Sequence, residues 1–334
     1  MSQPPSATRS ASSATNVLAT TLSNLAIHDR IALAFHVFML ARVAIAPQSA
    51  DADIAFRAGL GLFAVSVVSV LLARGEVLRP GKLRSLVYRV GIFFPVVLSY
   101  FQLRYLLPAL QPVMLDDTLR RLDESLLGIT PALWFNRFNT PVVVEWVAFF
   151  YYSYFYLMAA MLLPALFLDR GQRLREIMVG AVCVATLGHI GYTFVPGVGP
   201  HAAMEFPEPI HGGFFWQQVL LTVESAGAQM DIFPSLHTAY PTLYALHAFG
   251  WRRTRPFRWA WPIVAFFALN MIVATMFLRW HWFVDVLAGL ALAITARTIA
   301  VYVARREAVR DDPSDERQPV WEPLFGSNAE RATD

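Results

Sequence analysis

The chain has 334 residues, of which 56% are hydrophobic and 15% are charged, and its mean hydropathy is +0.46. Soluble domains carry about 25% charged residues, so this composition excludes an ordinary soluble domain and indicates a polytopic membrane protein. The net charge of +3 is small, and we expect no nucleic-acid partner. The single cysteine, Cys183, excludes an intrachain disulfide.

In chain order, the sequence predicts a disordered tail, a membrane domain and a second tail. Residues 1–27 are rich in Ser, Ala and Thr, which is typical of disorder. Residues 28–304 predict an all-α integral membrane bundle with about eight transmembrane helices (six to eight), and the charged residues 305–334 predict another disordered tail. The apolar segments that predict the spans are 31–47, 57–74, 86–108, 142–168, 177–196, 235–251, 258–279 and 281–304.

Basic residues gather in alternate connections between these segments. The connections at 74–89, 170–175 and 252–258 are rich in arginine, as is the start of the tail at 305, whereas 197–233 contains no Lys or Arg. With eight spans, all the basic segments and both termini fall on one face, which the positive-inside rule makes cytoplasmic. We therefore expect a multi-pass protein of a bacterial inner membrane, with 197–233 on the periplasmic face.

The segment 115–140 is the other long outer connection. Leucines recur in it at helical spacing, with charged residues between them, which predicts an amphipathic helix lying on the membrane. The pattern fits a packing lid and a substrate gate equally well.

Two histidine motifs fall on the predicted outer face. In the first, Asp231-Ile-Phe-Pro-Ser-Leu-His-Thr238, Ser235 is a good N-cap and places His237 in the first turn of a helix, where free N–H groups attract anions. In the second, His281 and Asp285 are four residues apart and share a helix face, so the carboxylate can hold the imidazole in the tautomer that attacks.

Two histidines, a carboxylate and a helix N-terminus predict a phosphoryl-transfer site. Neutral His281 is the candidate nucleophile, Asp285 stabilises the imidazolium that develops, and His237 protonates the leaving oxygen. The equatorial oxygens also need fixed donors. Candidates for phosphate binding are Ser235, Thr238, Arg279 and His201.

These motifs resemble a known family. Phe233–Thr238 is similar to the second signature of the type 2 phosphatidic acid phosphatase superfamily, and His281-x3-Asp285-x3-Gly289 is similar to the third. The resemblance covers about residues 85–305 and is closest to the inositol phosphorylceramide synthase branch, through Leu122–Pro131 and Pro196–Pro200.

The resemblance implies an enzyme that takes a membrane phospholipid or lipid phosphate, with a possible lipid alcohol as acceptor. It implies a phosphohistidine intermediate on the histidines named above, with no metal and no cofactor. The chain departs from the superfamily at its first signature, where Tyr192 and Gly199-Pro200 stand in place of the basic residues, and at Thr275, where an arginine is usual. Candidates to replace the missing cations are Arg279, His201, His211, Arg104 and Arg137.

Two other functions remain open. His237, His281 and Asp285 are also three possible ligands of a catalytic zinc, as in a metal-dependent hydrolase. The missing cations would fit a non-catalytic lipid-binding or transport protein. The sequence does not define the head group, the choice between water and an alcohol as acceptor, or the oligomeric state.

Overall fold

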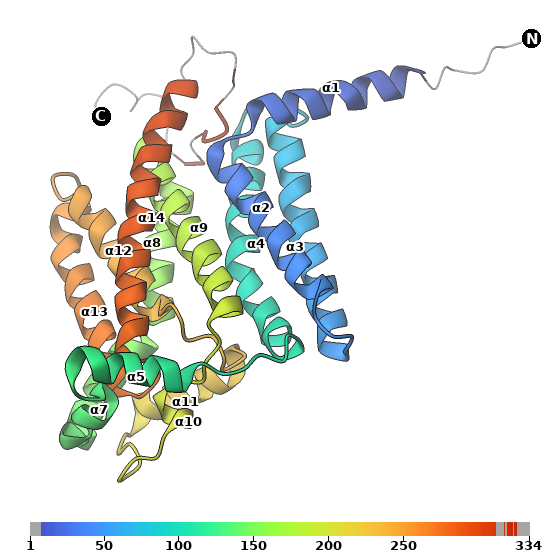
Figure 1. The fold of residues 1–334 in the computed structure, drawn as a ribbon. Coiled ribbons are helices and arrows are strands. Elements are labelled where there is room, and N and C mark those ends of the chain that lie inside the picture. The colour runs from blue at the N-terminus through green and yellow to red at the C-terminus, as the bar shows by residue number, and fades with distance from the viewer. Residues whose placement is uncertain (1–7, 312–316, 318, 323, 326–334) are drawn as a thin grey trace, which may run out of the picture.

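The structure is a computed structural model that describes residues 8–311, 317, 319–322 and 324–325, and this part of the chain contains helices and no strands. It confirms the predicted all-α membrane bundle (Figure 1). Six helical segments are long and apolar enough to cross a bilayer: α3 (Ala50–Arg74), α4 (Lys82–Ala109), α7 with α8 (Pro141–Leu168), α9 (Gly171–Phe194), α13 (Phe257–Phe277) and α14 (Phe283–Arg310).

The other two predicted spans are also helices of the bundle. α2 (Ile27–Ala44) has 18 residues, but three of its side chains are charged. α12 (Leu236–Gly250) has only 15 residues. The long fourth segment is interrupted at Ser153, between α7 (Pro141–Tyr152) and α8 (Tyr154–Leu168). The count therefore falls at the lower end of the predicted range, because two apolar segments are too charged or too short to cross alone.

α9 is the central helix, and 78% of its most apolar stretch is buried inside the bundle. It packs against α2, α4, α8, α12 and α14. The neighbouring pair α3 and α4 approach closely at Gly91, where a Cβ would lie 1.9 Å from the Ser69 hydroxyl oxygen. Small residues at such contacts let helix backbones come together in a membrane, where association depends on packing.

Short helices cover one end of the bundle. They are α5 (Asp116–Leu127), α6 (Pro131–Phe135), η1 (Asn136–Phe138), α10 (Pro200–Ala203) and α11 (Phe214–Ala226). Gly128, in the left-handed conformation at φ +68°, ends α5. Figure 1 shows α5, α10 and α11 at the end opposite α1 (Thr8–Asn24) and the last turns of α14. The predicted amphipathic helix is thus present, and it lies across this end.

Both predicted tails differ from the expectation of disorder where the structure describes them. α1 makes residues 8–24 helical. After α14, the side chains of Arg317, Val320, Trp321 and Leu324 are buried against the bundle. The charge of this segment predicted a solvated tail, but its charged side chains have partners on the bundle and its apolar side chains pack there. Residues 1–7, 312–316, 318, 323 and 326–334 of the predicted tails lie outside the described residues.

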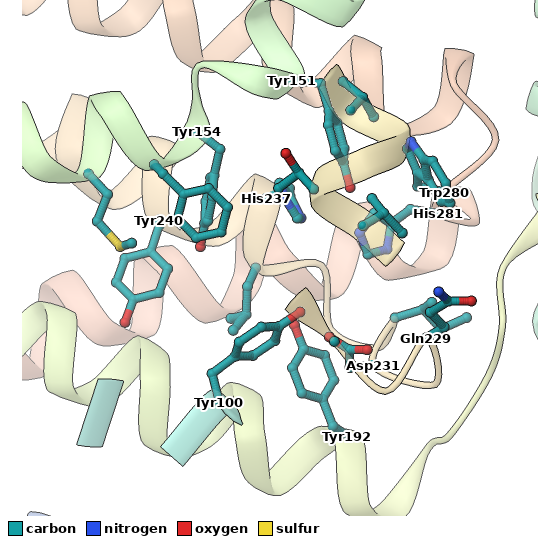
Figure 2. Close-up of a pocket in the computed structure, with 18 of the residues that line it drawn as sticks. Tyr100, Tyr151, Tyr154, Tyr192, Gln229, Asp231, His237, Tyr240, Trp280 and His281 are labelled. Atoms are coloured by element: carbon teal, nitrogen blue, oxygen red, sulfur yellow. The ribbon is translucent and has the colours of Figure 1, made fainter. Parts of the chain in front are cut away.

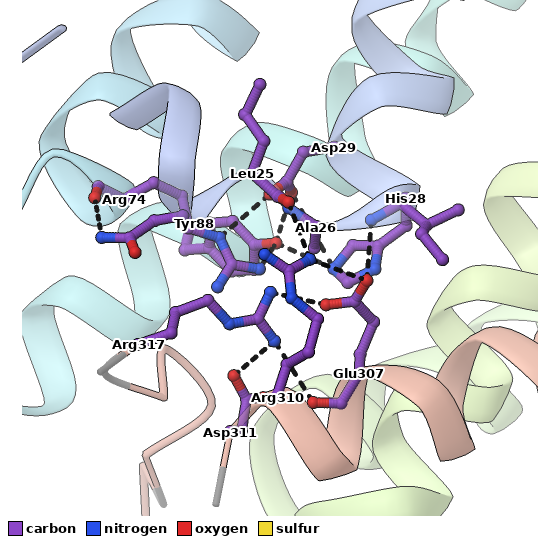
Figure 3. Close-up of polar contacts among 12 residues, drawn as sticks. Leu25, Ala26, His28, Asp29, Arg74, Tyr88, Glu307, Arg310, Asp311 and Arg317 are labelled. Atoms are coloured by element: carbon purple, nitrogen blue, oxygen red, sulfur yellow. Dashed lines mark hydrogen bonds and ion pairs between the residues drawn. The ribbon is translucent and has the colours of Figure 1, made fainter. Parts of the chain in front are cut away.

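A buried ionic cluster joins these terminal segments to the bundle (Figure 3). In α2, Asp29 pairs with Arg74 of α3 at 2.9 Å. In α14, Glu307 accepts the Ile27 N–H at 3.0 Å and an Arg317 N–H at 2.5 Å. Since isolated charges are costly in an apolar bundle, these reciprocal pairs hold the start of α2 and the segment after α14 in place.

We expect Glu307→Gln to lower the thermal stability of the protein in detergent. The substitution removes the charge that Arg317 faces in a buried position, and breaking such a pair costs about 3 kcal/mol. Thermal unfolding followed by circular dichroism measures the effect. Glu205→Gln is the matched control, because Glu205 is exposed. Equal unfolding temperatures for Glu307→Gln and the wild type would contradict a stabilising role for the cluster.

Candidate active site

A cavity of about 290 Å³ lies at the end of the bundle covered by the short helices. Its walls come from α4, α7, α8, α9, α10, α11 and α12, together with Val198 and the loops around 227–232 and 280–281. α11, which forms part of the wall, is capped by Glu145, whose carboxylate accepts the N–H groups of Gly213, Phe215 and Trp216 at 2.8–3.0 Å. Figure 2 shows tyrosine, histidine and tryptophan side chains pointing into the cavity.

The two sequence motifs dock directly on each other at this end. The Ser235 N–H donates to the Asp285 carbonyl at 3.0 Å. Gly289 makes the approach possible, because a Cβ there would lie 2.5 Å from the Ser235 carbonyl oxygen. The Ser235 hydroxyl caps α12 by accepting the Thr238 N–H at 3.3 Å, as predicted for an N-cap. The starts of α12 and α14 are thereby fixed side by side.

This docking brings His237 and His281 into the same cavity. Their ring centroids are 6.0 Å apart, so a single tetrahedral group between them can touch both rings. Asp285 lies beside His281, with 3.4 Å between Oδ2 and Nδ1. The same oxygen accepts the Trp282 N–H at 2.9 Å, which fixes the carboxylate at the start of α14.

His237 lies between two tyrosine rings. Tyr151 is stacked on it with a centroid distance of 4.4 Å and an interplanar angle of 14°. Tyr154 lies at 4.3 Å. Contact with a ring on each side orients the imidazole, and burial lowers the pKa of His237 to about 3, so the ring is neutral before substrate binds. The sequence analysis missed these residues, although the run Tyr151-Tyr-Ser-Tyr154 put polar hydroxyls in an apolar segment, which is a usable signal.

Burial determines the protonation state of His281. It lowers the pKa of His281 to about 4, against smaller opposing effects of the Asp231 carboxylate and of a hydrogen bond to the Ile232 backbone. The imidazole is therefore neutral near pH 7, which is the form that has a free lone pair.

Asp231 also lines the cavity, and the sequence analysis gave it no role of its own. Its carboxyl group is hydrogen-bonded to Tyr100, and burial raises its pKa although that bond opposes the shift. Figure 2 shows the hydroxyl groups of Tyr100 and Tyr192 directed toward the same region as Asp231. The cavity thus contains an acidic, tyrosine-rich side.

The predicted phosphate-binding residues are not gathered around the cavity. Arg279 instead donates to the Asn136 side chain at 2.7 Å and to the Glu208 carbonyl at 2.9 Å. Ser235 and Thr238 are fully buried in the helix contact. Of the four, His201 alone lines the cavity, where its ring lies 4.4 Å from that of Trp280. Ser235 therefore serves as the N-cap of α12, and Arg279 holds the loop that contains Glu208.

The further candidates for the missing cations also lie elsewhere. Arg104 donates to the Ser225 carbonyl at 2.9 Å, Arg137 lies over the Trp134 ring, and His211 pairs with Glu208 at 3.3 Å. None of them is among the described residues that line the cavity.

Two carboxylates of α5 hold the loops that carry the site. Asp123 accepts the N–H groups of Phe283 and Val284 at 2.7 and 2.9 Å, and so caps α14 two residues before Asp285. Asp116 accepts from the Trp282 indole at 3.0 Å and from the Val198 and Gly199 N–H groups at 2.9 and 2.8 Å. These bonds favour α5 as a packing brace over α5 as a mobile gate.

The zinc alternative requires His237, His281 and Asp285 to act as one ligand set. Within the described part of the chain, no group of three or more His, Cys, Asp or Glu side chains is placed to hold a metal ion. The arrangement of these residues therefore gives that alternative no support.

A protein-family model described as the PAP2 superfamily matches residues 117–299, which is more than half of the 334 residues. The match runs from α5 to α14 and contains both histidine motifs. No curated protein and no solved structure matched the chain.

We expect Asp123→Asn to lower kcat about 10- to 100-fold in the lipid phosphate assay described below, because a small displacement of the start of α14 moves Asp285 and His281. The matched control is Asp117→Asn on the same helix, whose side chain is 81% exposed. Steady-state kinetics on folded, purified variants measure the difference. A kcat for Asp123→Asn equal to that of the control would show that the cap does not position the site.

Proposed function

Because the chain belongs to the PAP2 superfamily, we propose that it is a membrane phosphoryl-transfer enzyme that acts on a lipid phosphate or phospholipid head group through a phosphohistidine. The observation that carries the proposal is the pair of histidines, His237 and His281, in one cavity with their rings 6.0 Å apart. The reacting phosphorus would lie between them.

The proposed chemistry has two halves. Neutral His281 attacks phosphorus, so that an N–P bond forms while the bond to the leaving oxygen breaks, and protonated His237 gives its proton to that oxygen. His237 then takes a proton from the acceptor, whose oxygen attacks phosphorus and releases His281. Asp285 stabilises the imidazolium form of His281. The negative charge of a bound phosphate raises the pKa of His237, which burial lowers in the free protein, and so lets His237 carry the proton.

The apolar wall of the cavity supports a lipid substrate. Val97 and Phe101 of α4 face this space together with Phe155 and Met158 of α8. Both helices pack on α9, and the Phe101 and Phe155 side chains are 55% and 43% exposed on the side of the bundle. In a membrane this side would meet acyl chains, so a lipid has a direct apolar route to the histidines.

The distribution of charge supports an extracytoplasmic site. Figure 1 places the turn between α3 and α4 and the last turn of α14 at the end opposite α5. The first of these, residues 74–89, is rich in arginine. By the positive-inside rule that end would be cytoplasmic, and the cavity would face the periplasm across a bacterial inner membrane.

The acceptor distinguishes a phosphatase from a phosphotransferase. Water gives free phosphate or a soluble head-group phosphate, whereas a lipid alcohol gives a new phospholipid. The likeness to the inositol phosphotransferase branch rests on Leu122–Pro131 and Pro196–Pro200, and both segments contain or contact the brace formed by Asp116 and Asp123. The two segments therefore support a likeness to that branch in how the outer loops are built. They do not indicate which head group is bound.

We expect His281→Ala and His237→Ala each to lower turnover by about 10³-fold or more, because each removes a group that forms or breaks a bond. The assay offers purified protein a panel of phospholipids and lipid phosphates, with and without a lipid alcohol, and measures phosphate and lipid products separately. His211→Ala is the matched control, since His211 is an exposed histidine outside the cavity. Full activity in either cavity variant would refute the proposed histidine mechanism, whereas no turnover by the wild type would favour a non-catalytic lipid-binding or transport role.

We expect the nucleophile limb of the pH profile of kcat/KM to have its midpoint near pH 4, at lower pH than an ordinary histidine would give. Burial holds the pKa of His281 at about 4, and protonation below that value removes the attacking lone pair. Formation of the phosphorylated enzyme, measured with labelled substrate as a function of pH, checks the prediction. A nucleophile midpoint near 6.5, the ordinary value for histidine, would contradict it.

A further inference from the structure

The charge of the cavity is unusual for a site that receives a phosphate. Among the described residues that line it there is no lysine and no arginine, and Asp231 is the single carboxylate. Sites that bind phosphoryl groups ordinarily place fixed positive charge around the oxygens. Here the neutral donors of His201, the tyrosines and the catalytic histidines are the groups available.

A substrate with only negative charge fits this cavity poorly. Its phosphate would lie in a largely apolar space with no lysine or arginine among the described lining residues to offset its charge, and such uncompensated burial is costly. A substrate that carries its own positive charge avoids the cost, because that charge can pair with the carboxylate while the phosphate reaches the histidines.

The walls near Asp231 suit a cation. Figure 2 shows Tyr100 and Tyr192 extending toward the carboxyl group, and the Tyr100 side chain is hydrogen-bonded to it. Aromatic rings together with one carboxylate are the combination that binds ammonium and quaternary ammonium groups, through ring quadrupoles and direct charge pairing.

We propose that the substrate is a zwitterionic phospholipid with an amino-alcohol head group, and that Asp231 with the neighbouring tyrosines forms the subsite for its ammonium group. This inference rests on the proposed function. Figure 2 shows Tyr154 and Tyr240 on one side of His237 and Asp231 on the other. The diacylglycerol part lies toward Tyr154 and the apolar wall, and the charged head lies toward Asp231.

This placement fixes which bond breaks. His281 forms a bond to phosphorus, the bond from phosphorus to the diacylglycerol oxygen breaks, and that oxygen receives the proton from His237. The phosphorylated amino alcohol remains on His281 with its ammonium group beside Asp231. Attack by water or by a lipid alcohol then releases it, and the acceptor proton returns to His237.

The test compares donors with identical acyl chains in the purified, full-length protein. Phosphatidylcholine and phosphatidylethanolamine carry a cationic head, phosphatidylglycerol and phosphatidylinositol carry a neutral one, and phosphatidic acid carries none. We expect kcat/KM for the first two to exceed that for the others by about tenfold. Asp231→Asn should remove this preference by lowering kcat/KM for phosphatidylcholine and phosphatidylethanolamine alone.

Two further variants keep the result interpretable. Asp117→Asn makes the same charge change at a side chain that is 81% exposed and should leave the preference unchanged. Tyr100→Leu removes a ring from the proposed subsite while keeping Asp231, and it should lower kcat/KM for the same two donors. This variant tests the subsite even if Asp231→Asn does not fold.

Preference of the wild type for phosphatidic acid or a neutral head group would overturn the inference and leave phosphoryl transfer standing. An equal loss with every donor in Asp231→Asn would also overturn it, because Asp231 would then act in the chemistry common to all donors. No turnover of any donor by the wild type would remove the proposed function itself.

Discussion

The candidate site depends on the contact between the first turns of α12 and α14. One backbone hydrogen bond, from the Ser235 N–H to the Asp285 carbonyl at 3.0 Å, joins the two helix starts. The absence of a side chain at Gly289 lets the backbones come that close. Because His237 follows Ser235 by two residues and His281 precedes Asp285 by four, this contact fixes the distance between the two imidazoles. A membrane offers little hydrophobic driving force between helices, so such close backbone packing is the main way to hold a geometry.

The outer loops are held by carboxylates that bind backbone N–H groups. Asp116, Asp123 and Glu145 each accept two or more hydrogen bonds, and together they fix the 197–200 loop, the start of α14 and the start of α11. Each carboxylate satisfies donors that would otherwise be unpaired at a helix start or in a loop. With these acids committed to structure, Asp231 is left as the carboxylate that faces the cavity, and this difference in role is the basis of the inference on the substrate head.

Sequence reasoning reached the bundle and the two histidine motifs because both are local signals. Apolar segments located the helices, and the spacing of His281 and Asp285 placed them together, 3.4 Å apart in the structure. It failed for Arg279, because a basic residue beside a motif looks the same whether it faces a ligand or, as here, a loop carbonyl. It also failed for the tail predicted from residue 305, because Glu307, the partner of Arg317, lies in that tail, and composition does not reveal that the two charges pair.

The sequence by itself determined a helical membrane protein, the segments that form its helices, the side on which arginine is concentrated, and the residues that resemble phosphoryl-transfer signatures. Hydropathy, helical period and capping act over a few residues, so they can be read along the chain. The tertiary structure alone decided that tyrosines of α7 and α8 contact the ring of His237 and that Asp123 caps a helix start 160 residues away. It also decided that Arg279 binds a loop carbonyl, so that no lysine or arginine is among the described residues that line the cavity. These contacts join distant segments, and only the packing of the bundle determines which side chains meet.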